Sequence, residues 1–488
     1  MRFTLINPSR TYSNNNPWRF IMGVVPPLGI ANLAAVLETE KHEVDLIDAN
    51  VFKYSPEDVC ARIYPDSEYI GISSFTINYP NALEYAKAIR KKFPKSKIIM
   101  GGVHPSVYHE NIVAQGIADL VIRGEGELPI LMLARNTPLQ EISNLTWKKG
   151  NDVIVNPSSN LFIDAKDMPL PAYHKLPMHL YHSSAGAAIR TPSIGVITSR
   201  GCPGGCTFCY SGMFGKKVRY QSADVVFRHI KHLIDTYNIK EISFYDDSFT
   251  TNNKRIFEIC DLIISNKLKI SWSCFARVDS VNEELLKKMK LAGCHQIMYG
   301  FESADEEILN SFNKRADVDK AKKAIHATNR AGIEIRGAYM MGGPDEKEEQ
   351  IQKTINYSLN YKIDYAVFNI TTPLPGTKLF VDVINAGHLK MPKDHEWAKF
   401  DLATPIMELP FLPSKTLAKY HKQAYISFYL RPVYILRRVF SKNAWLAIFV
   451  VVRQLIFEIL TRITKNRKNK CNDFEKSVSA YSLKTGEV

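Results

Sequence analysis

Two stretches of this chain alternate short β-rich runs with helical patterns, and this alternation restricts the fold more than any other feature of the sequence. In the first stretch, the expected strands are residues 2–8, 43–49, 69–75, 97–102 and 120–124. The expected helices lie near residues 29–40, 56–64, 79–92 and 106–116. Strand–helix alternation at this spacing is typical of a parallel, doubly wound sheet. We therefore expect residues 1–135 to form an α/β domain of that kind.

A proline-rich segment separates this part from a second alternation. Residues 136–190 contain prolines 169, 171 and 177 and are expected to be a linker. The second set of expected strands is 194–200, 241–246, 270–277, 296–302, 334–342 and 365–372, with helices such as 222–237 and 281–292 between them. Six successive strand–helix units predict a partial (β/α)6 barrel over residues 191–400. In such barrels, chemistry gathers on the loops that follow the strands.

The last part, residues 401–488, has a helical and partly apolar pattern with a strongly basic end. The chain has a formal net charge of +14, and basic residues crowd its C-terminal region. The apolar run Ala444–Val452 is interrupted by Arg453 and Glu458, whereas a bilayer span needs about 20 predominantly apolar residues. A buried helix and a peripheral membrane contact are both open interpretations of this region. No secretory signal is recognisable at the N-terminus, so we expect a cytoplasmic protein, peripheral at most to the inner face of the membrane.

Three cysteines lie close together in Gly201-Cys-Pro-Gly-Gly-Cys-Thr-Phe-Cys-Tyr210, directly after the first strand of the second set. Iron–sulfur cubanes normally use four thiolates, and structural zinc uses four closed ligands. Here the other cysteines (60, 260, 274, 294 and 471) are remote, and no histidine occurs between His182 and His229. Three ligands leave one metal position open, as catalytic sites do. We expect Cys202, Cys206 and Cys209 to bind a metal; a zinc site completed from afar is the alternative.

This Cys-x3-Cys-x2-Cys motif, with aromatic Phe208 before its last cysteine, resembles the radical S-adenosylmethionine superfamily. The resemblance implies a 4Fe–4S cluster whose open iron is chelated by S-adenosylmethionine. It further implies that one electron splits the sulfonium bond and produces a 5′-deoxyadenosyl radical. Segments that match the superfamily pattern bring Asp246, Arg277 and Glu302 to this cofactor together with Phe208. By this resemblance, an arginine would bind the methionine carboxylate and an acid the ribose hydroxyls.

The first domain resembles the cobalamin-binding domain that precedes one large class of these radical enzymes. The carrying segments include Gly71–Ser74, Gly101–Pro105 and Asp119–Glu127, which follow expected strands. The resemblance implies cobalamin contacts at these residues: Ser73, Ser74, Gly101, Gly102, His104, Gly124 and Glu125. The signature Asp-x-His-x-x-Gly is absent, so cobalamin would bind without a histidine below the cobalt. The fold class implied is a flavodoxin-like sheet, a partial barrel and a helical C-terminal region.

The function implied is methylation of an unactivated carbon in a small or lipid-like substrate by a cobalamin-dependent radical enzyme. The resemblance extends to the anaerobic magnesium-protoporphyrin monomethyl ester cyclases, so oxidative cyclisation or rearrangement stays open. A corrinoid- or cluster-binding sensor without catalysis is an alternative of another class. We expect an electron donor such as flavodoxin or ferredoxin as a partner. We expect no nucleic-acid partner, because only Cys60 precedes Cys202 and the tail is helical rather than β-rich.

Overall fold

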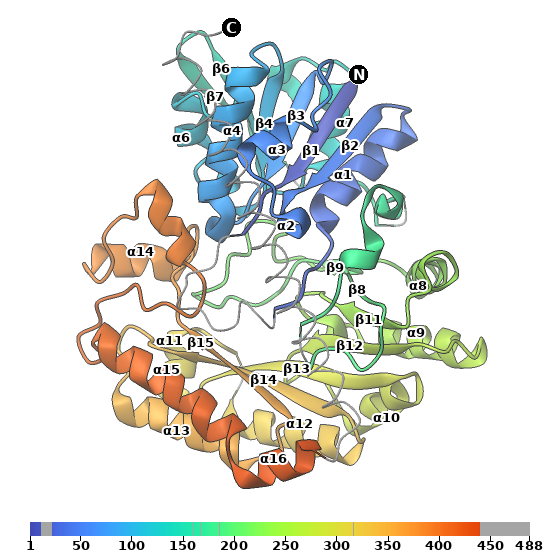
Figure 1. Cartoon of the computed structure of the whole chain (residues 1–488). Coiled ribbons are helices and arrows are strands. Elements are labelled where there is room, and N and C mark those ends of the chain that lie inside the picture. Colours follow the sequence, from blue (N-terminus) through green and yellow to red (C-terminus); the bar gives the residue numbers. More distant parts are fainter. Residues whose placement is uncertain (11–21, 160, 166, 185, 316, 440–488) are drawn as a thin grey trace, which may run out of the picture.

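The computed structural model describes residues 1–10 and 22–439, apart from residues 160, 166, 185 and 316. Two sheets are stacked one above the other, with the N-terminal sheet over the barrel-like second sheet (Figure 1). The segment that carries α14 (Lys378–Asn385) stands at one side, between the two units (Figure 1).

The first sheet has the strand order β2-β1-β3-β4-β5-β6-β7, in which β1 to β5 are parallel. These parallel strands are β1 (Arg2–Asn7), β2 (Glu43–Asp48), β3 (Tyr69–Ser73), β4 (Lys97–Gly101) and β5 (Leu120–Ile122). Their interiors are apolar on both faces because helices cover both sides of the sheet. The longer helices are α1 (Leu28–Thr39), α4 (Tyr79–Lys92) and α7 (Glu127–Ala134). The shorter ones are α2 (Ala49–Phe52), α3 (Pro56–Cys60), α5 (Val103–Val107) and α6 (His109–Ala114). The predicted flavodoxin-like domain is confirmed.

The sheet extends past residue 135, where the sequence predicted a linker. β6 (Leu145–Lys149) pairs antiparallel with β5, and β7 (Asp152–Val155) pairs antiparallel with β6. The linker predicted for residues 136–190 includes this hairpin, because edge strands with one solvated face are polar and lack a continuous apolar run. The connecting part of the chain therefore begins after the hairpin.

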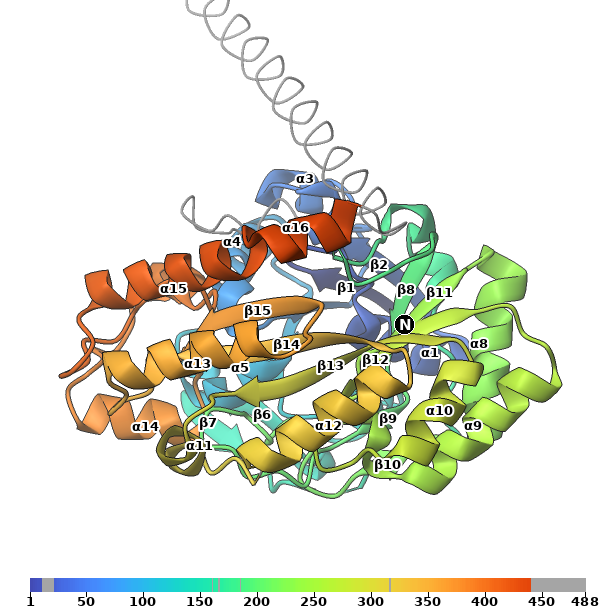
Figure 2. The same ribbon diagram turned by 90° about the horizontal axis from the view of Figure 1, so that it is seen from below.

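The second sheet has six parallel strands in the order β15-β14-β13-β12-β11-β8. They are β8 (Ser193–Val196), β11 (Glu241–Phe244), β12 (Ser271–Ala276), β13 (Cys294–Glu302), β14 (Glu334–Met341) and β15 (Tyr365–Ile370). Its helices are α8 (Ala223–Tyr237), α9 (Asn253–Ser265), α10 (Glu283–Leu291), α11 (Glu306–Ser311), α12 (Val318–Arg330) and α13 (Glu348–Asn360). Figure 2, seen from below, shows α10, α12 and α13 in front of the strands, on the side away from the first sheet. The predicted partial (β/α)6 barrel is confirmed.

Helix α15 (Ser414–Tyr429) packs against the edge strand β15 of the barrel. The Tyr425 hydroxyl accepts a hydrogen bond from the Phe368 N–H and donates one to the Phe368 carbonyl, both at 2.9 Å. Tyr429 does the same for Ala366. These contacts satisfy the edge strand β15, which would otherwise present unpaired backbone groups.

The C-terminal helical prediction holds for α15 and α16 (Pro432–Val439), but the apolar run 444–452 and most of the basic tail lie outside the described residues. Within the described part of the chain, no helix combines the length and apolarity that a bilayer crossing requires.

The connecting segment contacts both units. The Tyr181 hydroxyl donates to Asp48 of the first sheet at 2.8 Å, and the Tyr173 hydroxyl lies 2.9 Å from Nε2 of His229 on α8. Asp48 also accepts from Asn7, so the segment is attached to the strand ends β1 and β2. The connecting segment is therefore attached to both units.

Candidate active site

A cavity of about 800 Å³ lies between the carboxyl ends of the first sheet and the cysteine loop of the second unit. Eight of the residues predicted from the sequence line it: Cys202, Cys206, Cys209, Ser73, Gly101, Gly102, Gly124 and Glu125. The other six are not among the lining residues: Phe208, Asp246, Arg277, Glu302, Ser74 and His104. The structure thus brings the three cysteines of the loop and the glycine-rich strand ends to one space.

The cysteine loop closes on itself through a short antiparallel ribbon. β9 (Ser199–Arg200) pairs with β10 (Arg219–Tyr220), so the loop joins the two strands of one stem. Gly201 has φ +100°, and a β-carbon there would lie 2.4 Å from the Lys217 carbonyl oxygen. A β-carbon at Gly204 would lie 3.3 Å from the Cys202 sulfur and 4.0 Å from the Cys206 sulfur. The thiols of Cys202 and Cys206 therefore lie close to Gly204, and thiolates are the donors that iron–sulfur clusters use.

Phe208 holds this loop from outside the cavity. Its ring meets Phe312 edge to face at 5.3 Å and packs with Ile308 and Met340. The Thr207 N–H donates to the Phe312 carbonyl at 2.9 Å, on the turn that follows α11. Phe208 therefore anchors the cysteine loop, and its predicted cofactor contact stays a prediction.

Three charged side chains surround the thiols. Burial raises the pKa of Cys206, while Lys314 and Arg277 act in the opposite direction and Glu302 adds to the rise. Burial also raises the pKa of Cys209 to about 11. Since metals bind the thiolate, these cations favour the form that a cluster requires.

Arg277 and Glu302 lie at the ends of their strands, close to the loop. Arg277 is held by Asp279 at 2.7 Å and by the carbonyl of Arg315, and its Nη1 is 3.8 Å from where a Gly204 β-carbon would lie. Glu302 has φ +60° at an irregularity of β13 and pairs with Lys314 at 2.7 Å. A β-carbon at Gly300 would lie 2.4 Å from Glu302 Oε1, so the carboxylate lies directly over Gly300.

Asp246, predicted to contact the cofactor, hydrogen-bonds to the chain that precedes the cysteine loop. It is fully buried, and it accepts hydrogen bonds from the Thr198 N–H at 2.6 Å, the Thr198 hydroxyl at 2.7 Å and the Ser199 hydroxyl at 2.7 Å. Both of its oxygens are thus used to hold the chain between β8 and β9. The neighbouring Asp247 lines the cavity instead, and burial followed by the charge of Asp246 raises its pKa. The sequence alone does not distinguish which of these two adjacent aspartates faces the cavity.

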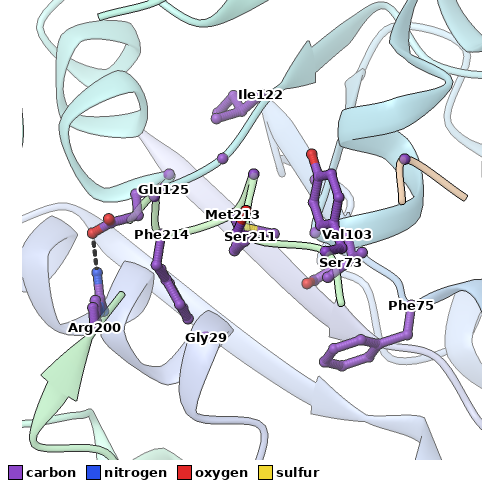
Figure 3. A pocket seen from close by; sticks show the side chains of 18 of the residues that line it. Gly29, Ser73, Phe75, Val103, Ile122, Glu125, Arg200, Ser211, Met213 and Phe214 are labelled. Atoms are coloured by element: carbon purple, nitrogen blue, oxygen red, sulfur yellow. Dashed lines mark hydrogen bonds and ion pairs between the residues drawn. The ribbon is translucent and has the colours of Figure 1, made fainter. Parts of the chain in front are cut away.

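The strand ends of the first sheet form a close-fitting wall of the cavity. Gly102 has φ +95° and ψ −174°, and a β-carbon there would lie 2.6 Å from the Ser74 carbonyl oxygen. The Ser74 hydroxyl is buried and has no hydrogen-bond partner among the described residues. Gly124, with φ +69°, follows β5, and Met213 of the cysteine loop faces it. Figure 3 shows Met213 and Ser211 between Glu125 on one side and Ser73 on the other.

His104 does not reach the cavity. It is buried in an aromatic cluster with Tyr79 at 4.0 Å, Tyr108 at 4.8 Å and Trp397 at 4.9 Å. Burial lowers its pKa to about 3. The sequence places His104 beyond the end of a strand as a cobalamin contact, but α5 (Val103–Val107) begins there and turns the ring into the core. His104 is therefore a packing residue.

Glu125 is engaged in ion pairs that the sequence did not reveal. It pairs with Arg200 at 2.6 Å (Figure 3) and with Arg219. Glu127 also pairs with Arg200, at 2.6 Å. Arg200 lines the cavity two residues before Cys202. No local pattern marked Arg200, because its partners are distant in the chain.

The comparisons with known proteins agree with this geometry. The family described as the radical SAM superfamily matches residues 196–358, and the B12 binding domain matches residues 21–134. An uncharacterized methyltransferase of Pyrococcus horikoshii is 34% identical over 86% of this chain and 91% of its own length. The anaerobic magnesium-protoporphyrin IX monomethyl ester cyclase of Cereibacter sphaeroides is 24% identical over 84% of this chain and 68% of its own length.

Two solved structures share the fold. The radical S-adenosylmethionine methyltransferase TsrM of Kitasatospora setae, with cobalamin and a 4Fe–4S cluster bound, superposes with a TM-score of 0.63 at 14% identity, over 80% of this chain and 76% of its own. The cobalamin-dependent radical enzyme OxsB, with aqua-cobalamin bound, has a TM-score of 0.64 at 20% identity, over 87% of this chain and 61% of its own. Both therefore share the fold over most of this chain.

Proposed function

This chain belongs to the radical S-adenosylmethionine superfamily, in the class that carries a B12 binding domain, and from that membership we propose that it methylates an unactivated carbon of a small or lipophilic substrate. Its cofactors are a 4Fe–4S cluster, S-adenosylmethionine and cobalamin. When bound, the cluster supplies the electron that cleaves S-adenosylmethionine, and the corrinoid carries the methyl group.

One observation carries the proposal: a single cavity is lined on one side by the three cysteines and on the other by the strand ends of the B12-like sheet. Cys202, Cys206 and Cys209 would hold the iron. Gly102 and Gly124 would let the backbone approach the corrinoid, since neither presents a side chain to the cavity. Both groups would then face the same substrate.

The roles of the two polar residues near the thiols follow from their charge. Arg277 would bind the carboxylate of S-adenosylmethionine through the guanidinium edge that is nearest to Gly204. Glu302 would accept hydrogen bonds from the ribose hydroxyls, with Lys314 holding the carboxylate in place. Lining side chains such as Phe75, Val103 and Phe214 give the rest of the cavity an apolar surface suited to a lipophilic substrate.

The proposal is tested by following methyl transfer from S-adenosylmethionine to cobalamin, a step that can be measured before the substrate is known. The full chain is reconstituted anaerobically with iron, sulfide and hydroxocobalamin, reduced, and supplied with S-adenosylmethionine carrying a deuterated methyl group. We expect the labelled methyl in the cobalamin fraction and 5′-deoxyadenosine in solution. Cys60→Ala, which changes a buried thiol outside the loop, serves as the control and should behave as wild type. Release of 5′-deoxyadenosine without any label on cobalamin would contradict methylation.

Cyclisation or rearrangement with the same cofactors is a second candidate, favoured by the similarity to the protoporphyrin ester cyclase. The same labelling experiment separates the two, because cyclisation transfers no methyl group to the product. Cell extract added as a source of substrate should yield a compound heavier by one labelled methyl if the chain is a methyltransferase.

The reaction requires a reductant in addition to a small-molecule substrate. We propose that a flavodoxin or ferredoxin supplies the electron, because the chain itself offers no second cluster motif besides the cysteine loop. Either protein, reduced by its own reductase, should replace dithionite in the release of 5′-deoxyadenosine. Failure of both, with dithionite effective, would exclude this donor class.

A peripheral membrane contact also remains a proposal. On the α15–α16 turn and on α16, Leu430, Val433 and Leu436 are more than half exposed, and the basic Arg437 lies on the same helix. We expect the full chain to float with anionic vesicles, and the triple Leu430→Ser/Val433→Ser/Leu436→Ser variant to float less. Leu291→Ser, at an exposed apolar residue of α10, is the matched control. Equal flotation of the two variants would reject the contact.

A further inference from the structure

Two arginines stand side by side at the stem of the cysteine loop. In the β9–β10 ribbon, Arg200 is directly paired in register with Arg219. Like charges opposite each other in a ribbon repel, so this arrangement requires partners of opposite charge. Those partners come from the other domain.

Glu125 and Glu127, from the turn that leads into α7, complete the group. Arg200 Nη1 contacts Glu125 Oε2, and Arg200 Nη2 contacts Glu127 Oε1, each at 2.6 Å. Arg219 contacts both oxygens of Glu125, with Nη1 at 3.2 Å from Oε2. Two cations and two anions thus form a neutral group, which we call the interdomain clamp.

The clamp is shielded from water. The two glutamate side chains are 6% and 7% exposed, and that of Arg200 is 16% exposed. The Arg200 guanidinium lies 5.4 Å from the centre of the Phe214 ring, and that of Arg219 lies 3.8 Å from the Phe162 ring. Burial lowers the pKa of Arg200, but the charges of Glu127 and Glu125 outweigh this effect. The pKa is therefore raised above its usual value, and the arginine stays charged.

Along the chain, the clamp residues lie next to both walls of the cavity, the cysteine loop and the strand ends of the first sheet. Only Gly201 separates Arg200 from Cys202, and Glu125 directly follows Gly124, which lines the cavity. Arg200 and Glu125 line the same cavity (Figure 3). A shift of the clamp would therefore move the first cluster ligand relative to the corrinoid wall, with almost no flexible chain between them.

We infer that the interdomain clamp sets the separation and orientation of the cluster and the corrinoid, and that Arg200, Arg219, Glu125 and Glu127 are positioning residues for methyl transfer. This inference rests on the proposed function. Buried ion pairs are weak evidence for stability, because desolvation offsets their attraction, but their fixed geometry can specify one arrangement. Arginine suits this task, since its planar fork contacts two carboxylates at once, whereas lysine is a point charge.

Other contacts hold the two units together without the clamp. The 3₁₀ helix η7 (Asp394–Lys399) carries Trp397 against His104 and Tyr108, on α5 and directly after it. Tyr181 and Asp48 join the connecting segment to the first sheet. Variants of the clamp should therefore remain folded and loaded while the distance between the cofactors changes.

The test measures the magnetic coupling between the reduced cluster and cob(II)alamin in the loaded full chain. This coupling falls with the cube of their separation, so it reports geometry rather than activity. We expect a resolved splitting of the cob(II)alamin signal in wild type and its loss in Glu125→Gln/Glu127→Gln at equal iron and cobalt content. Arg200→Lys should lose part of the splitting. Glu40→Gln, which breaks the Glu40–Arg135 pair within the first domain, should retain it.

Each outcome decides between the two claims. If wild type binds no cobalamin or no cluster, the proposed function fails, and the inference fails with it. If wild type shows the splitting and both clamp variants keep it, the clamp does not position the cofactors, although the proposed function stands. Should the double variant fail to load, Arg200→Lys alone decides, since it keeps the charge and removes the shared contact.

Discussion

Replacing Gly102 by alanine tests the corrinoid wall of the cavity most sharply. With φ +95° and ψ −174°, this position lies in a backbone region that only glycine occupies readily, and a residue forced there costs about 1–3 kcal/mol. The added β-carbon would also lie 2.6 Å from the Ser74 carbonyl oxygen and 3.0 Å from its nitrogen. The Ser74 N–H donates to the Gly101 carbonyl of β4 and the Ser74 carbonyl accepts from the His104 N–H of α5, so neither backbone atom can rotate away. We expect Gly102→Ala to lose about 3 kcal/mol or more of unfolding free energy.

Gly116→Ala is the matched control in the same domain. Gly116 has φ +70°, and a β-carbon there meets nothing within 4 Å, so alanine should cost only about 1 kcal/mol. Urea unfolding of both apoproteins, followed by circular dichroism, gives the two free energies. Titration with hydroxocobalamin should show binding by Gly116→Ala and at least tenfold weaker binding by Gly102→Ala. Equal stability of the two variants would refute the steric argument.

Four further changes test other parts of the account. Phe208→Ala removes the ring that packs on Phe312 and should lower stability by about 2–4 kcal/mol and the iron content after reconstitution, measured by chelator assay. Glu302→Gln should weaken S-adenosylmethionine binding about tenfold or more in equilibrium dialysis with iron content unchanged; unchanged affinity would remove Glu302 from the site. Asp246→Asn weakens the three hydrogen bonds that the buried carboxylate accepts from Thr198 and Ser199 and should cost about 1–3 kcal/mol in urea unfolding. His104 has a pKa of about 3 when folded, so below pH 6.5 the unfolded chain binds a proton that the folded chain does not. The unfolding free energy should therefore fall by about 2 kcal/mol from pH 6.5 to pH 5. In His104→Gln, the unfolding free energy should depend on pH less steeply, by the contribution of this one proton.

The sequence predicted the architecture well because parallel strands covered on both faces are short apolar runs. Residues 69–75 and 97–102, for example, became β3 and β4 with their ends trimmed by one or two residues. The predicted linker includes the β6–β7 hairpin, because its polar edge strands lack that signal. The cysteine loop was recognisable from spacing alone, since its ligands are local.

Contacts between distant segments could not be read in the same way. Asp246 and Asp247 are adjacent and chemically identical, and only the positions of Thr198 and Ser199 decide that Asp246 is enclosed. His104 looked like a loop residue until Trp397 covered it. Glu125 was placed correctly at the cavity, but its pairing with Arg200 joins two domains and leaves no trace in local sequence.

The most direct test of the central claim is the composition and activity of anaerobically reconstituted full chain beside its Cys202→Ala/Cys206→Ala/Cys209→Ala variant. We predict about four irons and one cobalamin per wild-type chain, with 5′-deoxyadenosine released on reduction in the presence of S-adenosylmethionine. The triple variant should keep the cobalamin and lose both the iron and the 5′-deoxyadenosine. Iron content and 5′-deoxyadenosine release that survive the three substitutions would contradict the account.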